Sequence, residues 1–175
     1  MIDPLSCLAA AIYFESGSES LKGKIAVAKV IMNRVEAQFR GEKTVCGIIK
    51  DHRQFSFYSD GKPESPPRHN ELEVKAWEES YLIASSFLAE GGNGSHFEDT
   101  TKGSLHYHAS WLKKYPCWHN PDNYIKIDQH LFIPEIMQCV TEDKKAPVQG
   151  AFYFKRLPSQ QLILLAQGTS LYLEH

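Results

Sequence analysis

The stretch AIYFESGSESLKGKIAVAKVIMNRV, residues 11–35, is the feature that most constrains the fold of this chain. It sets two carboxylates, Glu15 and Glu19, between two apolar segments with the spacing of helices. Acidic residues thus interrupt a pattern that otherwise belongs to a protein core. They are either solvated helix-end residues or the working acids of an enzyme, and the rest of the sequence has to decide between these interpretations.

Helices are predicted along the first half of the chain. Residues 5–15 contain no helix breaker, and apolar residues recur at helical spacing over 21–35. The glycine and serines at 16–20 predict a turn between them, and a serine there can cap the second helix. Residues 54–70 are dense in Gly, Pro and Ser and predict a long loop, a kind of segment that is often functional. A further helix is expected over 71–90, ended by the glycines of EGGNG.

The second half changes character. SLHYHASW (104–111) and YIKIDQHLFI (124–133) alternate apolar and polar residues, as strands or extended arms do. AFYFKR (151–156) is another candidate strand. The predicted class is therefore α+β, mostly helical, with a small β region.

Composition limits the possible partners. With 175 residues, 42% hydrophobic and 23% charged, the chain suits a single globular domain over 1–172. Its formal net charge of -2 gives no electrostatic reason to expect nucleic acid as a partner. No apolar run approaches the roughly 18 residues of a membrane span, so no transmembrane segment is expected. We also expect the protein to be a monomer. The last residues, 173–175, are expected to be the start of an affinity tag.

The cysteines at 7, 46, 117 and 139 have no C-x-x-C spacing, which makes zinc-ribbon and thioredoxin-type sites poor hypotheses. Disulfides in any of three pairings, or buried thiols, remain open. A nucleophilic Cys46 or Cys117 with a histidine base is a further alternative. The apolar setting of Cys46 in TVCGII disfavours a thiolate and favours a structural role.

Glu15 is the better candidate for an acid catalyst. It follows AIYF at the end of the first predicted helix, beside aromatic residues that would disfavour its charged form. A general acid that protonates a glycosidic oxygen needs that environment. Glu19, near the start of the second helix, can instead complement the helix dipole, and we expect a supporting role for it.

Residues Gln54, Phe55 and Ser56 open the long loop with an amide, an aromatic ring and a hydroxyl. Such a trio can hydrogen-bond sugar hydroxyls or an N-acetyl group and stack on the apolar face of a sugar. A loop with a buried phenylalanine explains the same residues equally well.

Histidines supply a competing hypothesis. His106 and His108 would share one face of a strand, with His119 and His130 downstream. Three imidazoles can hold a catalytic zinc, which would make the protein a zinc amidase or peptidase. No H-E-x-x-H motif and no strong acidic ligand accompany the pair, so histidines of a groove or core are favoured. No metal or other cofactor is expected.

Taken together, the motifs resemble the SleB/CwlJ-type cell wall hydrolases, the spore cortex-lytic enzymes and their relatives. LAAAIYFESGSESLKGKIAVAKVIMNRV is similar to the opening of that family, in which an apolar segment and a Tyr precede Glu-Ala-Arg-Gly-Glu and a helix ending in Asn-Arg-Val. TVCGII, QFS, DTTKGSLHYHA and IDQHLF follow in the family's order, so the resemblance covers about residues 5–133. Residues 134–172 form an extension beyond it.

The resemblance implies a lysozyme-like fold that acts on the glycan strands of peptidoglycan. The family's catalytic acid/base maps onto Glu15, and Tyr107 stands in one of the closing motifs. The implied reaction is that of a lytic transglycosylase, in which one acid cleaves the bond between N-acetylmuramic acid and N-acetylglucosamine and the muramyl 6-hydroxyl closes a 1,6-anhydro ring. A hydrolytic muramidase using the same Glu is the alternative.

The sequence departs from the family in places. Ser-Gly-Ser replaces Ala-Arg-Gly between the glutamates, and Thr100 stands where proline is usual. A glycan-binding module with a decayed site is the non-enzymatic alternative. The expected place of action is the cell wall, in the periplasm or outside the cell. Because the N-terminus lacks the features of a secretory signal, a phage enzyme released by a holin and a bacterial enzyme without its leader are both consistent with the sequence.

Overall fold

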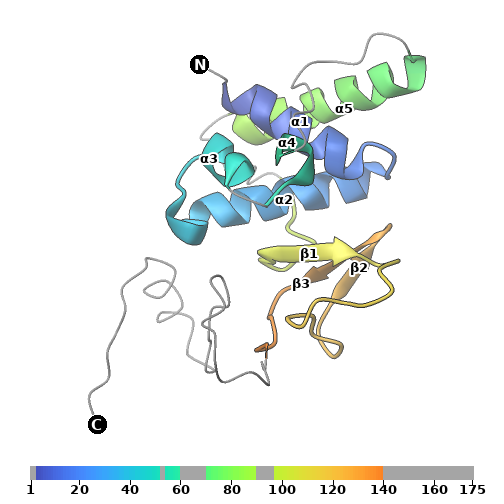
Figure 1. Cartoon of the computed structure of the whole chain (residues 1–175). Helices are drawn as coiled ribbons and strands as arrows, with labels where there is room; N and C mark the ends of the chain where they lie inside the picture. The colour runs from blue at the N-terminus through green and yellow to red at the C-terminus, as the bar shows by residue number, and fades with distance from the viewer. Residues whose placement is uncertain (1–2, 52–53, 60–69, 90–96, 140–175) are drawn as a thin grey trace.

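A computed structural model describes residues 3–51, 54–59, 70–89 and 97–139 of the chain. A group of helices precedes a small sheet that lies to one side of them (Figure 1). The elements, in chain order, are α1 (Pro4–Ser16), α2 (Leu21–Glu36), the 3₁₀ turn η1 (Phe39–Gly41), α3 (Val45–Lys50), α4 (Ser56–Ser59), α5 (Glu71–Leu88), β1 (His106–Ala109), β2 (Ile125–Ile127) and β3 (His130–Ile133). The α+β class with a small β region is confirmed.

The two helices expected around the acidic turn form within a residue of their predicted bounds. Asp3 caps α1, its side chain accepting a hydrogen bond from the Ser6 amide at 3.0 Å, and Pro4 occupies the first helical position. Ser20 caps α2 as predicted, accepting from the Gly23 amide at 3.3 Å. Each helix therefore begins where a short polar side chain can satisfy an otherwise unpaired backbone N–H.

Helix α2 runs through the core and is buried on most of its circumference, basic side chains included. Lys24 Nζ lies 2.6 Å from Glu79 of α5, and Lys29 Nζ lies over the Phe87 ring at 5.5 Å. Near the end of the helix, Arg34 is 6% exposed. Because a buried charge is costly without a partner, these contacts fix α2 in place among its neighbours.

The sheet is antiparallel in the order β1-β3-β2. Residues 124–133, predicted as one extended segment, are a hairpin in which two residues connect β2 to β3. Asp128 occupies the left-handed region at φ 47°, which Asp tolerates better than most residues. Apolar and polar residues alternate only as far as Asp128; three polar residues, 128–130, and three apolar ones, 131–133, follow.

All the cysteines are paired. Cys7 of α1 is bonded to Cys46 of α3, and Cys117 to Cys139. The sequence left three disulfide pairings and free thiols open, and the structure has the pairing Cys7–Cys46 and Cys117–Cys139. No thiol is left to act as a nucleophile, so the hypothesis built on Cys46 or Cys117 is wrong.

Some expectations need correction or cannot be compared. The loop expected from residue 54 contains a short helix, α4, and α5 ends at Leu88, before the glycines expected to terminate it. The glycine-rich EGGNG segment, the candidate strand at 151–156 and the tag-like residues 173–175 lie outside the described residues.

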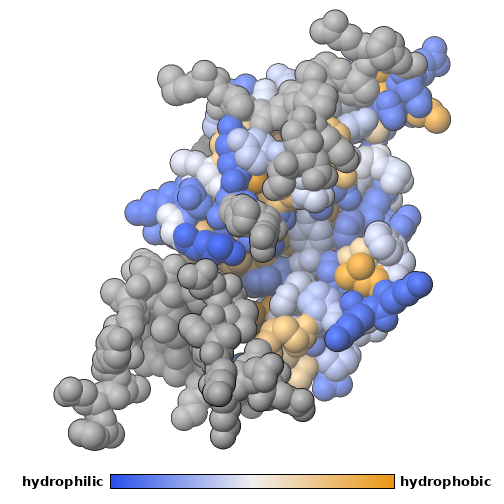
Figure 2. All heavy atoms as spheres, viewed as in Figure 1, coloured by the Kyte–Doolittle hydropathy of each residue, from blue (hydrophilic) through white to orange (hydrophobic). Residues whose placement is uncertain are grey.

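Hydrophilic residues and small hydrophobic patches are interspersed on the described part of the face seen in Figure 2. The large apolar side chains exposed among the described residues include Leu72, Tyr81 and Leu82 of α5 and Trp111 after β1. None of the helices described here combines the length and apolar character that crossing a membrane requires.

Candidate active site

Glu15 and Tyr107 meet where the helices adjoin the sheet. Glu15 lies in the last turn of α1, and Tyr107 on β1 donates a hydrogen bond from its hydroxyl to Glu15 Oε2 at 2.9 Å, across 92 residues of sequence. Burial and, next, the charge of Glu15 raise the pKa of Tyr107 well above its ordinary value. The phenol therefore stays protonated and remains a donor to the carboxylate.

Asp99 is the centre of several hydrogen bonds in the loop before β1. Asp99 accepts hydrogen bonds from the Thr101 amide at 2.8 Å, the Gly103 amide at 2.8 Å and Asn33 Nδ2 of α2 at 3.1 Å. Burial alone would raise the pKa of Asp99, but a hydrogen bond from the Thr101 hydroxyl, together with the bonds just given, outweighs burial and lowers the pKa. Since Asn33 Nδ2 also donates to the Ser104 carbonyl at 3.3 Å, the end of α2 sets the start of the strand that carries Tyr107.

Arg34 gives the site its positive charge. Its Nε donates to the Leu105 carbonyl at 2.7 Å, and its guanidinium carbon lies 5.0 Å from the Phe39 ring centre and 5.6 Å from that of Phe55. Burial lowers the pKa of Arg34, while the negative charge of Glu15 acts in the opposite direction. Arginine stays charged in proteins regardless, so a guanidinium field acts on both members of the Glu15–Tyr107 hydrogen bond.

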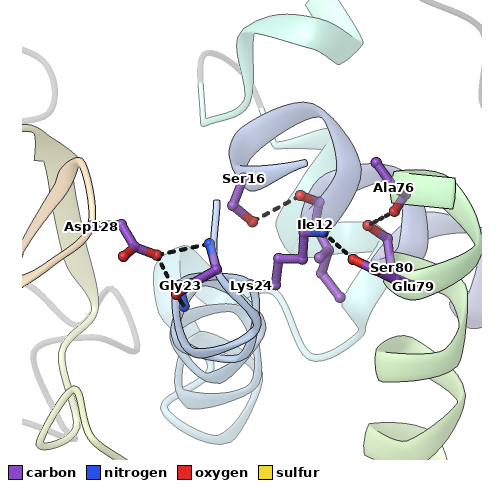
Figure 3. A network of polar contacts seen from close by, with 9 residues as sticks. Ile12, Ser16, Gly23, Lys24, Ala76, Glu79, Ser80 and Asp128 are labelled. Atoms are coloured by element: carbon purple, nitrogen blue, oxygen red, sulfur yellow. Dashed lines mark hydrogen bonds and ion pairs between the residues drawn. The ribbon is translucent and has the colours of Figure 1, made fainter. Parts of the chain in front are cut away.

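Asp128 joins the hairpin turn to the start of α2 (Figure 3). Its Oδ2 accepts from the Ser20 amide at 3.0 Å and from the Ser20 hydroxyl at 2.6 Å. Glu19, the residue before, has a side chain only 5% exposed, with Oε1 3.0 Å from His130 Nδ1 of β3. The turn between α1 and α2 is therefore fastened to the sheet by acidic side chains on both sides of the contact.

Gly23 of α2 lies directly under this contact, and an added methyl group has no room there. A Cβ on Gly23 would collide with Asp128 Oδ2 and stand 2.6 Å from Glu19 Oε2. In a helix, Gly→Ala ordinarily stabilises by about 1 kcal/mol. Here we expect Gly23→Ala to lower the free energy of unfolding by about 1–3 kcal/mol, as overpacking does, measured by urea denaturation. Lys22→Ala, at the exposed neighbouring position, is the control and should be nearly neutral; a stabilised Gly23→Ala would contradict the crowding.

His106 and His108 share one face of β1, as predicted, and the rings of both contact Trp118, at 5.4 and 5.5 Å between centres. His108 Nε2 lies 2.9 Å from His119 Nδ1. Tyr107 points to the other face, so the structure brings Tyr107 to Glu15 and leaves both histidines apart from that hydrogen bond. Within the described ranges no three His, Cys, Asp or Glu side chains converge as metal ligands, so this part of the chain offers no ligand set for the zinc hypothesis.

Burial, aided by Arg34, lowers the pKa of His106 to about 4 from its ordinary 6.5. The unfolded chain therefore binds the proton more tightly than the folded one between these values. We expect the free energy of unfolding to fall as pH drops from 6.5 towards 4, by about 3 kcal/mol from this residue. Denaturant titrations at several pH values, compared with His106→Gln, measure the effect. An equally steep pH dependence in His106→Gln would contradict it.

The Gln54–Phe55–Ser56 trio divides. Phe55 is 1% exposed and its ring packs against the Arg34 guanidinium, so the ring cannot stack on a sugar. The alternative of a loop with a buried phenylalanine is confirmed for this residue. Ser56 is exposed and Gln54 partly buried. A role in substrate binding stays a prediction for these two.

Sequence reasoning did not assign Arg34, Asp128 or His130 to the site. The first lies in Asn33-Arg34-Val35 and the others in IDQHLF (127–132), both quoted above as motifs of the resemblance. The motifs therefore contained these residues and could have drawn attention to them. The sequence did not show which side chains pair across more than 100 residues, as Ser20 does with Asp128.

Comparison with known proteins adds to this geometry. A search of solved structures finds the catalytic domain of SleB, a germination-specific lytic transglycosylase from Bacillus anthracis, at 30% identity and a TM-score of 0.52, covering 74% of this chain and 93% of that one. The catalytic domain of Bacillus cereus SleB matches at 30% identity and a TM-score of 0.50, covering 74% and 88%. No curated protein sequence matches.

The fold and the site thus define a relative of bacterial cell wall hydrolases. The model of the cell wall hydrolase family matches residues 18–133, and the chain belongs to that family, of the SleB/CwlJ type. The matched range begins at Ser18, three residues after Glu15. The predicted family and lysozyme-like fold are confirmed, while the role of Glu15 has to be argued from the site itself.

Proposed function

We propose that this protein cleaves the glycan strands of peptidoglycan as a lytic transglycosylase, with Glu15 as its acid and base. The observation that carries the proposal is the hydrogen bond from Tyr107 to Glu15 at 2.9 Å. It gives one carboxyl group, at the junction of helices and sheet, a fixed donor and a nearby guanidinium. The likeness to the SleB catalytic domain, itself described as a lytic transglycosylase, supports the choice of substrate and reaction.

In the first step, protonated Glu15 gives its proton to the oxygen that links N-acetylmuramic acid to N-acetylglucosamine, and the glycosidic bond breaks. The carboxylate that remains is stabilised by the Tyr107 hydroxyl and by the Arg34 charge. In the second step, the oxygen of the muramyl 6-hydroxyl forms a bond to C1 of the same sugar, and the Glu15 carboxylate takes the proton that this hydroxyl loses. A 1,6-anhydro ring forms, and Glu15 is protonated again.

A single acid is enough for this reaction because the substrate supplies the nucleophile. Glu19, the other carboxylate of the motif, has a buried side chain with one oxygen at His130. The usual glycosidase pair needs a second carboxylate as base or nucleophile at the scissile bond. A Glu19 held in this way is a poor candidate for that task, which favours the transglycosylase over the hydrolytic muramidase.

Product analysis tests the proposal. Purified peptidoglycan is digested with the protein, and the soluble fragments are identified by mass spectrometry. We expect anhydromuramyl ends. Reducing muramic acid ends would show hydrolysis with the same bond specificity, and stem peptides released from intact glycan would overturn the assignment in favour of an amidase or peptidase.

A further inference from the structure

The side chain of Glu19 is buried, although the residue lies in a turn between two helices, where a carboxylate could be in water. Its side chain is 5% exposed, and Oε2 has no hydrogen-bond partner within the described part of the chain. Burial of a carboxylate is costly, and an acid that only complemented a helix dipole could do so from the surface. The position of Glu19 calls for another explanation.

The partner of Glu19 leads toward the site. Oε1 lies 3.0 Å from Nδ1 of His130, whose side chain is 10% exposed. The two atoms are within ion-pair distance, but the contact does not have hydrogen-bond geometry, and Nδ1 has no other partner in the described part of the chain. The His130 ring packs edge-on against the Tyr107 ring, with centres 5.0 Å apart and planes at 86°. Tyr107 and His130 come from adjacent strands, β1 and β3. A contiguous path of contacts therefore runs from Glu19 through His130 to the phenol that donates to Glu15.

We infer that Glu19 and His130 form a positioning pair, which orients the Tyr107 ring so that its hydroxyl stays on Glu15. This inference rests on the proposed function of Glu15. The Glu19 carboxylate holds the His130 imidazole in place. The imidazole packs against the Tyr107 ring and prevents that ring from turning toward His130. Phe132 packs on the same ring at 5.6 Å and completes its enclosure. Neither member of the pair touches the reacting atoms.

Replacement of Glu19 tests the pair directly, with soluble uncrosslinked glycan strands as substrate. We expect Glu19→Ala to lower kcat about tenfold, since a slightly misplaced group costs up to about a hundredfold, while KM stays within about twofold. Glu19→Gln keeps an oxygen toward His130 and should recover most of the activity. Glu19→Gln as inactive as Glu15→Gln would overturn the inference, because Glu19 would then take part in the chemistry.

A double-mutant cycle distinguishes positioning from a general loss of structure. Tyr107→Phe and His130→Gln should each cost about tenfold in kcat, and the double variant should be no worse than Tyr107→Phe alone, because His130 acts through Tyr107. Losses that multiply to about a hundredfold would overturn the inference. Melting curves establish that each variant is folded.

The outcome stays informative if Glu19→Ala or His130→Gln does not fold. Nitrogen-15 NMR of the His130 imidazole in the wild type and in Glu19→Gln should show a proton on Nδ1, and an unprotonated Nδ1 facing Glu19 would overturn the pair. Failure of the inference is distinct from failure of the function. A wild type that leaves the glycan intact fails the proposed function, whereas an active wild type matched by Glu19→Ala fails only the inference.

Discussion

Glu15→Gln should abolish glycan cleavage while leaving the fold intact. The amide keeps the shape of the side chain and can still accept the Tyr107 hydrogen bond seen at 2.9 Å, but it has no proton of suitable acidity to give to the glycosidic oxygen. General acid catalysis contributes roughly 10²–10⁴-fold, so kcat should fall by at least that range, with both steps of the reaction lost together. Release of soluble fragments from purified peptidoglycan measures the loss.

Glu36→Gln is the matched control. Glu36 also stands at the end of a helix, α2, but is exposed, and its replacement should leave activity within about twofold, as expected for a surface site. Both variants should melt at the temperature of the wild type. A Glu15→Gln protein that retains a tenth or more of wild-type activity would remove Glu15 from the reaction.

The largest expected effect on stability comes from the disulfide between Cys7 and Cys46. It closes a segment of 39 residues and joins α1, which carries Glu15, to α3. By the chain-entropy model, a disulfide that closes a loop of this size lowers the entropy of the unfolded chain and so stabilises the folded state by about 4 kcal/mol. We expect Cys7→Ala/Cys46→Ala to lose most of that amount in urea denaturation and to melt well below the wild type.

Cys117→Ala/Cys139→Ala provides the comparison. Its bond spans 22 residues, worth about 3 kcal/mol on the same account, and lies outside the helices. We expect a smaller loss of stability for this pair. A reductant should still lower the midpoint of the Cys7→Ala/Cys46→Ala variant, because that variant keeps the Cys117–Cys139 bond. A Cys7→Ala/Cys46→Ala protein as stable as the wild type would show that helix packing alone holds α1 and α3 together.

Local pattern predicted those parts of the fold that local forces determine. The helix over 21–35 and its Ser20 cap needed only apolar periodicity and one short polar side chain, and both formed as expected. The break at Asp128 was not predicted, because residues 124–133 were interpreted as one extended segment and only Asp128 and Gln129 separate the two strands. A two-residue turn with no glycine leaves little trace in composition.

The site was predicted as far as the chemistry of single residues allows. Glu15 and Tyr107 were both named in advance, yet nothing in the sequence said that they touch. That hydrogen bond depends on Arg34 and Asn33, which hold the chain just before β1 through backbone carbonyls. Contacts of this kind leave no periodic signal. Phe55 shows the opposite error, since an aromatic ring that could have faced a sugar is used to enclose a guanidinium.

The 92 residues between Glu15 and Tyr107 also bear on how the protein becomes active during folding. Contacts between residues distant in sequence form late, because closing a long loop costs entropy before any contact repays it. Association of the helices alone therefore leaves the chain inert. Catalytic competence requires the sheet to dock on the helices, and regained activity in a refolding experiment should not precede the recovery of helical circular dichroism.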